Sequence, residues 1–170
     1  PRPSRSWLSC AVMSFQPPPS RLFAHGFSFE VPKDWECARE TFVARCEPLA
    51  EGDTYMRLGV YAELDRNGTR SLEDLRPQLT RPFSRTAEDG SAHQSTVIDV
   101  RNAIVDGREW LDAQYTYAEI GEDIRMMVTY NGPYMLFVNL ASDAKARERA
   151  AAVLDGIVAS MELDAGDAGL

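Results

Sequence analysis

The side chains of this sequence that could do acid-base or nucleophilic chemistry are two histidines and a scatter of carboxylates. A nucleophilic Ser or Cys needs a base beside it and a third group that orients the base. His25 precedes Gly26 at the edge of a predicted strand, and His93 lies in the loop sequence EDGSAHQS. The sequence has no G-x-S-x-G, G-x-G-x-x-G or G-x-x-x-x-G-K-[ST] motif. We therefore expect both histidines to be solvent-exposed loop residues, and we predict no catalytic residue and no cofactor.

Pairs of carboxylates that could share acid-base work occur at two places, Asp112 with Glu119 and the Glu122-Asp123 turn. An acidic protein offers such pairs by chance, so neither pair is specific. Asp112 interrupts a predicted strand that is otherwise mostly apolar. It is interpreted either as a partner-facing or ion-paired carboxylate or as a solvent-facing residue at a sheet edge, and the pattern favours the solvent-facing residue.

The cysteines Cys10, Cys37 and Cys46 form neither a C-x-x-C pair nor an even set. Together with two histidines they are too few for most zinc sites, so we predict no metal. Cys37 and Cys46 could form a disulfide in an oxidising compartment. The sequence favours buried or idle thiols instead.

The net charge of -8, from 18 basic and 26 acidic residues, argues against polyanionic partners. Proteins that bind nucleic acid gain affinity from cations placed along the phosphates. No stretch approaches the roughly 18 uninterrupted apolar residues that a membrane-spanning helix needs. We therefore expect another protein or a peptide as partner, with no nucleic acid and no membrane span, while the oligomeric state stays open.

The elements that must position these residues begin with strands predicted at about 27–31, 41–46 and 55–64. A short helix follows, capped by Ser71 or Asp74 and ending before Pro82. Strands at about 96–105, 108–118, 124–130 and 134–140 then form an antiparallel meander. Its two-residue type I′ turns are predicted at Asp106-Gly107 and Asn131-Gly132.

A closing helix is predicted after the meander, with Ser142 or Asp143 as its cap and an apolar stripe that ends at Met161. The strand at 134–140 is apolar on both faces and so needs cover on both. The predicted fold class is α+β, an antiparallel sheet flanked by helices in an α/β/α sandwich.

Composition divides the chain into three segments. Residues 1–20 are rich in Pro, Ser and Arg and read as a flexible tail or leader remnant, residues 21–163 as a single domain, and residues 164–170 as a disordered tail. A start at Met13 would make the protein cytoplasmic. A missing signal sequence before Cys10 would make it an extracytoplasmic lipoprotein, so the compartment stays open.

Aromatic residues and methionines crowd the predicted strands of the meander, and such side chains make adaptable binding surfaces where they are exposed. Trp110 is the strongest anchor, because it shares a strand face with Asp112 and Gln114. The predicted binding residues are Trp110, Asp112, Gln114 and Met127. This site requires Trp110 to be exposed.

The order of FSFEVPKDW, VDGREWLDAQY, NGPYMLFVNLAS and AAVLDGIVASMEL resembles the PsbP-like superfamily over about residues 21–163. That fold is shared by extrinsic photosystem II subunits, a eukaryotic Ran-binding import factor, DcrB-type bacterial lipoproteins and effector-associated chaperones of type VI secretion. Phe29, Pro32 and Trp35 carry its opening motif, and Ile157 and Ser160 its closing one. These motifs are structural, so the resemblance implies a fold and no catalytic residue.

The leading hypothesis is a noncatalytic bacterial protein-binding domain, an adaptor or secretion-effector chaperone that docks a peptide or helix on its sheet. The alternative is an extracytoplasmic lipoprotein module that binds a small ligand or supports the cell envelope.

Overall fold

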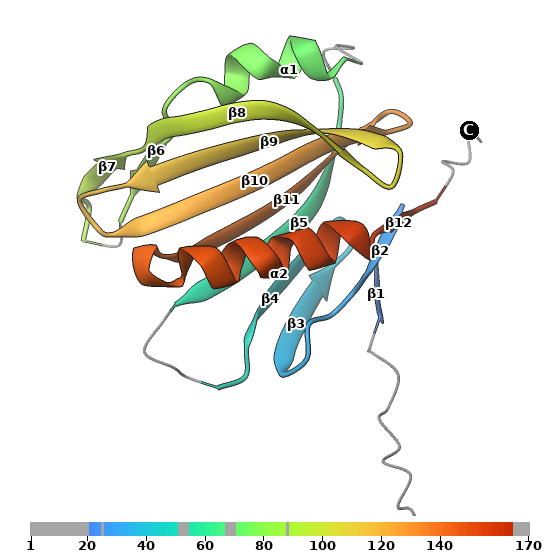
Figure 1. The fold of residues 1–170 in the computed structure, drawn as a ribbon, viewed down its shortest axis with the longest axis horizontal. Coiled ribbons are helices and arrows are strands. Elements are labelled where there is room, and N and C mark those ends of the chain that lie inside the picture. Colours follow the sequence, from blue (N-terminus) through green and yellow to red (C-terminus); the bar gives the residue numbers. More distant parts are fainter. Residues whose placement is uncertain (1–20, 25, 51–54, 67–70, 88, 165–170) are drawn as a thin grey trace, which may run out of the picture.

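Within the described residues, seven strands form one antiparallel sheet with a helix on each face (Figure 1). The computed structural model describes residues 21–24, 26–50, 55–66, 71–87 and 89–164. Across the sheet the strands follow the order β3-β4-β5-β11-β10-β9-β8. Their bounds are β3 (Trp35–Glu40), β4 (Val43–Pro48), β5 (Met56–Leu64), β8 (Thr96–Val105), β9 (Arg108–Tyr117), β10 (Glu122–Asn131) and β11 (Tyr134–Asp143).

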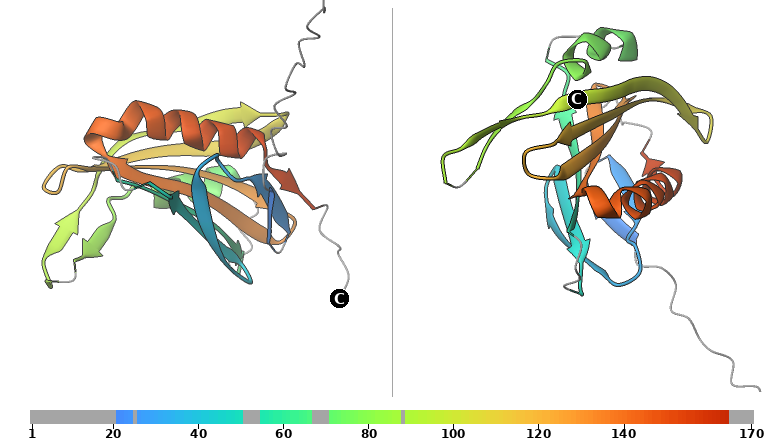
Figure 2. Two further views of the ribbon diagram at one scale, coloured as in Figure 1. Left: turned by 90° about the horizontal axis from the view of Figure 1, so that it is seen from below. Right: turned by 60° about the vertical axis from the view of Figure 1, so that its left-hand side comes forward.

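The remaining strands form two small sheets outside the main one. The first has the order β1-β2-β12, with bounds β1 (Arg21–Ala24), β2 (Phe27–Glu30) and β12 (Glu162–Leu163). The strand predicted at 27–31 is therefore present as β2, but it pairs away from the main sheet. The second is a hairpin of β6 (Ser84–Thr86) and β7 (Ala92–Gln94), which projects from the body of the molecule (Figure 2).

The long helix, α2 (Arg147–Ala159), lies across one face of the main sheet and follows a short 3-10 turn, η1 (Ala144–Ala146) (Figure 1). Asp143 makes no capping hydrogen bond through its side chain. Its carboxylate accepts a hydrogen bond from the backbone N–H of Tyr55 at 2.6 Å. The predicted cap at Ser142 or Asp143 is therefore wrong, because β11 extends to this point and Asp143 ties it to the start of β5.

The short helix, α1 (Leu72–Leu79), lies against the other face of the sheet. The hydroxyl of Ser71 accepts a hydrogen bond from the backbone N–H of Glu73 at 3.2 Å. Ser71 is thus the N-cap, and the alternative start at Asp74 is wrong. Pro77 consequently lies inside the helix, on its exposed side.

The two predicted hairpin turns differ in outcome. Asp106 and Gly107 have φ values of 49° and 76°, as a type I′ turn requires. Asn131 is instead the last paired residue of β10, so the central residues of the second turn are Gly132 and Pro133. Gly132 has φ of 58°, and a glycine at the first central position is typical of a type II′ turn. The second turn therefore lies one residue later than predicted.

The single strand predicted at about 41–46 is a hairpin of β3 and β4. The β3 sequence WECARE shows no clean alternation, because β3 is an edge strand whose residues Glu36, Ala38 and Glu40 are all exposed. β3 is held in place by its ladder to β4, in which all six residues of β3 are paired. A cross-strand ladder of this kind leaves little trace in a local hydrophobic pattern.

A disulfide joins Cys37 of β3 to Cys46 of β4. The two residues lie directly opposite each other in the ladder, with their Cα atoms 4.1 Å apart. The preference for idle thiols was therefore wrong, because the hairpin register brings both side chains to one face at facing positions. Cys10 lies outside the described residues.

Alternation along the strands sorts the buried side chains into two cores. The core beneath α2 includes Trp110 and Leu154, and the core beneath α1 includes Leu75 and Tyr115. No helix within the described ranges is long and apolar enough to cross a membrane.

Candidate functional site

Two of the four predicted binding residues, Trp110 and Met127, are buried in the core beneath α2. Their side chains leave residue exposures of 2% and 1%. Trp110 lies beside Val158 and Met161, at the end of α2. The prediction that Trp110 is exposed is therefore wrong, and in this structure it offers no surface for a partner. Of the polar residues that share its strand face farther along β9, Asp112 is buried as well and Gln114 is half-buried.

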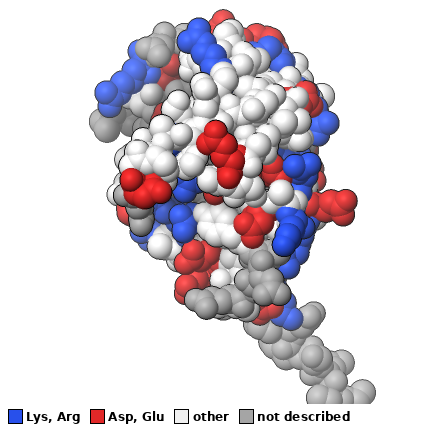
Figure 3. Space-filling model, turned by 90° about the vertical axis from the view of Figure 1, so that its left-hand side faces the viewer, with Lys and Arg blue, Asp and Glu red and all other residues white. Residues whose placement is uncertain are grey.

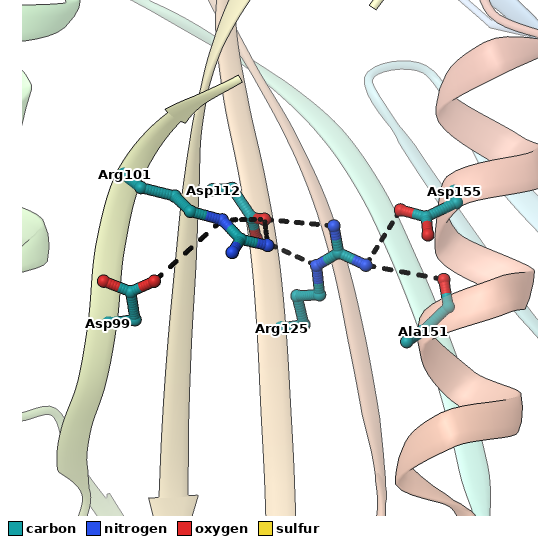
Figure 4. A network of polar contacts seen from close by, with 6 residues as sticks. All are labelled: Asp99, Arg101, Asp112, Arg125, Ala151 and Asp155. Carbon is teal, nitrogen blue, oxygen red and sulfur yellow. Dashed lines mark hydrogen bonds and ion pairs between the residues drawn. The ribbon is translucent and has the colours of Figure 1, made fainter. Parts of the chain in front are cut away.

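Asp112 is the centre of a polar network on the same face (Figure 4). Its residue exposure is 1%. Its carboxylate accepts hydrogen bonds from Arg125, Nε to Oδ1 at 2.9 Å and Nη2 to Oδ2 at 3.0 Å. Arg101 donates to Oδ2 as well, through Nη2 at 3.0 Å. The favoured interpretation as a solvent-facing residue was thus wrong and the ion-paired alternative correct, because a buried carboxylate is stable only when it is paired.

Arg125 extends this network to α2. Its Nη1 lies 2.8 Å from Oδ1 of Asp155 and 3.5 Å from the backbone oxygen of Ala151 (Figure 4). Burial lowers the pKa of Arg125, but hydrogen bonds to Asp112 and the charges of Asp112 and Asp155 outweigh burial, so its pKa is raised. The guanidinium therefore stays charged and links β9, β10 and the helix.

A groove of about 380 Å³ lies above this network, between the edge strand β8 and α2. Its lining includes Ile98 and Arg101 of β8, Gln114 of β9, and Arg147, Ala150 and Ala151 of α2. Gln114 is therefore the one predicted binding residue whose half-buried side chain lines a cleft.

The opposite face of the sheet is only partly covered. Helix α1 packs over β9 and β10, where Leu111 and Tyr115 are buried. Beside it, the apolar side chains of β10, β11 and β5 on this face are only half-buried, and those of β10 and β11 pack against the edge of the core beneath α1. They include Met126, Met135, Phe137 and Tyr61. We call this surface the open face.

Tyr61 and Phe137 form the centre of the open face. They are register partners on β5 and β11, and their rings stack with centroids 4.8 Å apart and planes 11° from parallel. Burial, with a smaller effect of the Glu63 charge, raises the pKa of Tyr61 to about 12. β11 is thus apolar on both faces as predicted, but the cover expected on its second face is incomplete.

Gly59 lies in the next row of the open face. It pairs with Asn139, whose side-chain oxygen occupies the place that a Cβ on Gly59 would take. The row continues to Arg45 of β4. A hollow of about 630 Å³ adjoins it, lined by side chains that include Glu36, Arg45, Glu47 and Arg57. Charged groups therefore border the apolar centre on the β3–β4 side.

His93 is neither in a loop nor free. It lies in β7, with Nδ1 2.8 Å from Glu119 Oε2 and Nε2 3.0 Å from Ser91 Oγ. Ser91 in turn donates its hydroxyl proton to Asp89 at 2.6 Å. A Ser–His–acid order is present, but the serine proton is used by Asp89 and is not given to the ring. The arrangement fastens the β6–β7 hairpin to the β9–β10 turn, and sequence reasoning missed it because Glu119 lies 26 residues beyond His93 in the chain.

The described ranges contain no group of three or more His, Cys, Asp and Glu side chains placed to hold a metal ion. His25 lies outside the described residues.

Among solved structures, the chain is similar to the solution structure of cyanobacterial PsbP (CyanoP) from Synechocystis sp. PCC 6803. The TM-score is 0.63 at 17% identity, and the match covers 85% of this chain and 91% of that one. A crystal structure from Bacteroides thetaiotaomicron VPI-5482 has a TM-score of 0.43 at 10% identity, covering 81% of this chain and 45% of that one, and supports no inference. No family model matches the sequence, and neither does any curated protein.

The chain therefore has an α+β, PsbP-like fold. At 17% identity the likeness concerns the fold alone, so function has to be argued from the two sheet faces.

Proposed function

We propose that the protein is a noncatalytic binding domain that docks an apolar segment of another protein on its open face. The observation that carries the proposal is the row of half-buried apolar side chains beside α1, centred on Tyr61 and Phe137. Aromatic residues and methionines are enriched where proteins bind one another, and methionine adapts to varied partners. Met126 and Met135 flank the stacked rings on the same face.

The charges around the open face indicate the chemistry of the partner. On the open-face side of β3, β4 and β5, four exposed glutamates lie against two exposed arginines; they are Glu36, Glu40, Glu47 and Glu63, against Arg45 and Arg57. The whole chain carries -8. Complementary charge guides association and suppresses wrong partners. The occupant is therefore an apolar segment flanked by basic residues.

A pair of synthetic peptides tests this proposal. Both carry the same Leu/Ala segment, one flanked by lysines and the other by glutamates, and binding is followed by fluorescence anisotropy. The lysine-flanked peptide should bind more tightly, and Phe137→Glu should weaken it about tenfold or more, as loss of an apolar anchor does. Ile104→Glu is the matched control, because Ile104 is an exposed apolar residue on the edge strand β8, which β9 separates from the strands of the open face.

Equal binding of the two peptides would contradict the proposed basic flanks of the partner. Equal effects of the two variants would show that the open face is not the binding site. Circular dichroism of each variant shows whether its fold is intact.

The Cys37–Cys46 disulfide favours an extracytoplasmic location over a cytoplasmic one. Disulfides persist in oxidising environments and are rare in reducing ones. We propose that the domain acts outside the cytoplasm. Alkylation of the protein as drawn from its native cells tests this: without reductant Cys37 and Cys46 should be protected from the reagent, and labelling of both would contradict it.

A further inference from the structure

We infer that the groove between β8 and α2 is a second binding site, on the face opposite the open face, and that its ligand is a carboxylate with an apolar body. The groove measures about 380 Å³, within the range of roughly 300 to 1,000 Å³ typical of small-ligand pockets. Figure 3 shows the side of the molecule that lies on the left in Figure 1, where uncharged side chains cover much of the surface and acidic and basic side chains lie among and around them.

Two arginines supply the anion-binding chemistry from opposite walls. Within the described residues, every hydrogen bond of Arg101 goes to Asp112, through Nε and Nη2. The one hydrogen bond of Arg147 to described residues goes from Nε to Asp123 at 2.7 Å. The side chains are 57% and 67% exposed. The Nη1 donors of Arg101 and the Nη donors of Arg147 therefore remain for a ligand, and a guanidinium edge suits a carboxylate.

The aspartates at the groove are already paired with arginines, which lowers their repulsion of a ligand carboxylate. Asp112 and Asp123 have side-chain exposures of 1% and 12%, and each is already paired with an arginine. Asp155 is paired with Arg125. With Asp99, which lies 3.9 Å from Arg101, three arginines thus stand against four aspartates, so the charges of this groove are close to balanced in a chain of net charge -8. An anion is repelled less here than over most of the surface.

Apolar side chains supply the rest of the recognition. Ile98 is 60% exposed and lines the groove at a β-bulge, where the β8–β9 register shifts between Val97 and Asp99. Bulges re-aim side chains at the edges of sheets. Ala150 and Ala151 line the opposite wall on α2, where their small size keeps the groove open. A ligand can therefore place its carboxylate on an arginine and its apolar body against Ile98.

Octanoate is the first probe, with 1-octanol as the uncharged comparison and binding followed by NMR chemical shifts or calorimetry. Octanoate should bind and octanol should bind at least about tenfold more weakly, since a charge-assisted pair is lost. Arg147→Gln and Ile98→Glu should each weaken octanoate about tenfold. Ile104→Glu places the same charge on β8 outside the groove and should change affinity less than about twofold.

A second pair of probes separates the two sources of such a carboxylate. N-acetyl-Leu-Leu with a free carboxylate is compared with its amide. Binding of the free acid in preference to octanoate identifies a peptide C-terminus as the ligand, and the reverse order identifies a fatty acid.

Equal affinity for octanoate and octanol, failure of both carboxylates to bind, or equal losses in Ile98→Glu and Ile104→Glu would each overturn the inference. Phe137→Glu should bind octanoate like the wild type, so this result is separate from that of the open face.

Discussion

Asp112 and Arg125 lie on adjacent strands and form a two-pronged ion pair, with distances of 2.9 Å and 3.0 Å between their facing atoms. Arg125 is the register partner of Gln114, so its side chain reaches diagonally to Asp112. The carboxylate is 1% exposed and the arginine side chain 18%. The pair lies beneath the groove between β8 and α2.

Asp112→Ala should destabilise the fold by about 2 to 3 kcal/mol, because it leaves Arg125 partly buried without its main partner. Urea denaturation measures the change. Asp99→Ala is the matched control: Asp99 lies 3.9 Å from Arg101 and is 47% exposed, so its loss should cost about 0.5 kcal/mol or less. Equal small effects would show that the network carries no stability.

Tyr61→Phe should change how stability depends on alkaline pH. Burial raises the pKa of Tyr61 in the folded protein to about 12 from its ordinary value of 10.0, so ionisation opposes folding. The contribution of the neutral ring is fully present below about pH 10 and is lost as pH rises towards 12. Between about pH 9 and pH 11.5 the variant should gain up to about 2 kcal/mol relative to wild type. Parallel stability curves would contradict this.

Gly132→Ala and Gly156→Ala should have opposite effects. A Cβ at either position meets nothing within 4 Å, so space does not distinguish them. Gly132 has φ of 58°, where an L-residue costs about 1 to 2 kcal/mol. Gly156 lies inside α2, where alanine is better than glycine by up to about 1 kcal/mol. Thermal unfolding should therefore show a lower Tm for the first variant and a higher Tm for the second. Shifts of the same sign would contradict a turn between β10 and β11 that needs a positive φ at Gly132.

Replacing both Cys37 and Cys46 with serine should cost about 2 to 3 kcal/mol. The disulfide closes a loop with a sequence separation of 9, and that loop is constrained in the unfolded chain only while the bond is intact. Wild-type protein unfolded in reductant should match the double variant. If the oxidised wild type is no more stable than the variant, the bond contributes nothing to folding.

Local signals in the sequence were enough for the meander and its first turn. β8, β9 and β11 begin where the pattern predicts, and Asp106-Gly107 adopts the predicted turn, because these features depend on neighbours in the chain. The second turn moved by one residue because the ladder pairs Asn131. The β3–β4 hairpin did not follow from the pattern, because an edge strand needs little apolar character.

The sequence by itself determined the α+β class, the two-faced apolar character of β11 and the strand face that Trp110 shares with Asp112 and Gln114. Those properties follow from the two-residue period of a strand. Only the tertiary structure decided which face is covered at which point. The end of α2 buries Trp110, its middle leaves a groove near Gln114, and α1 is too short to cover Phe137. Burial depends on the length and direction of helices packed from elsewhere in the chain, and the alternation of a single strand carries no record of either.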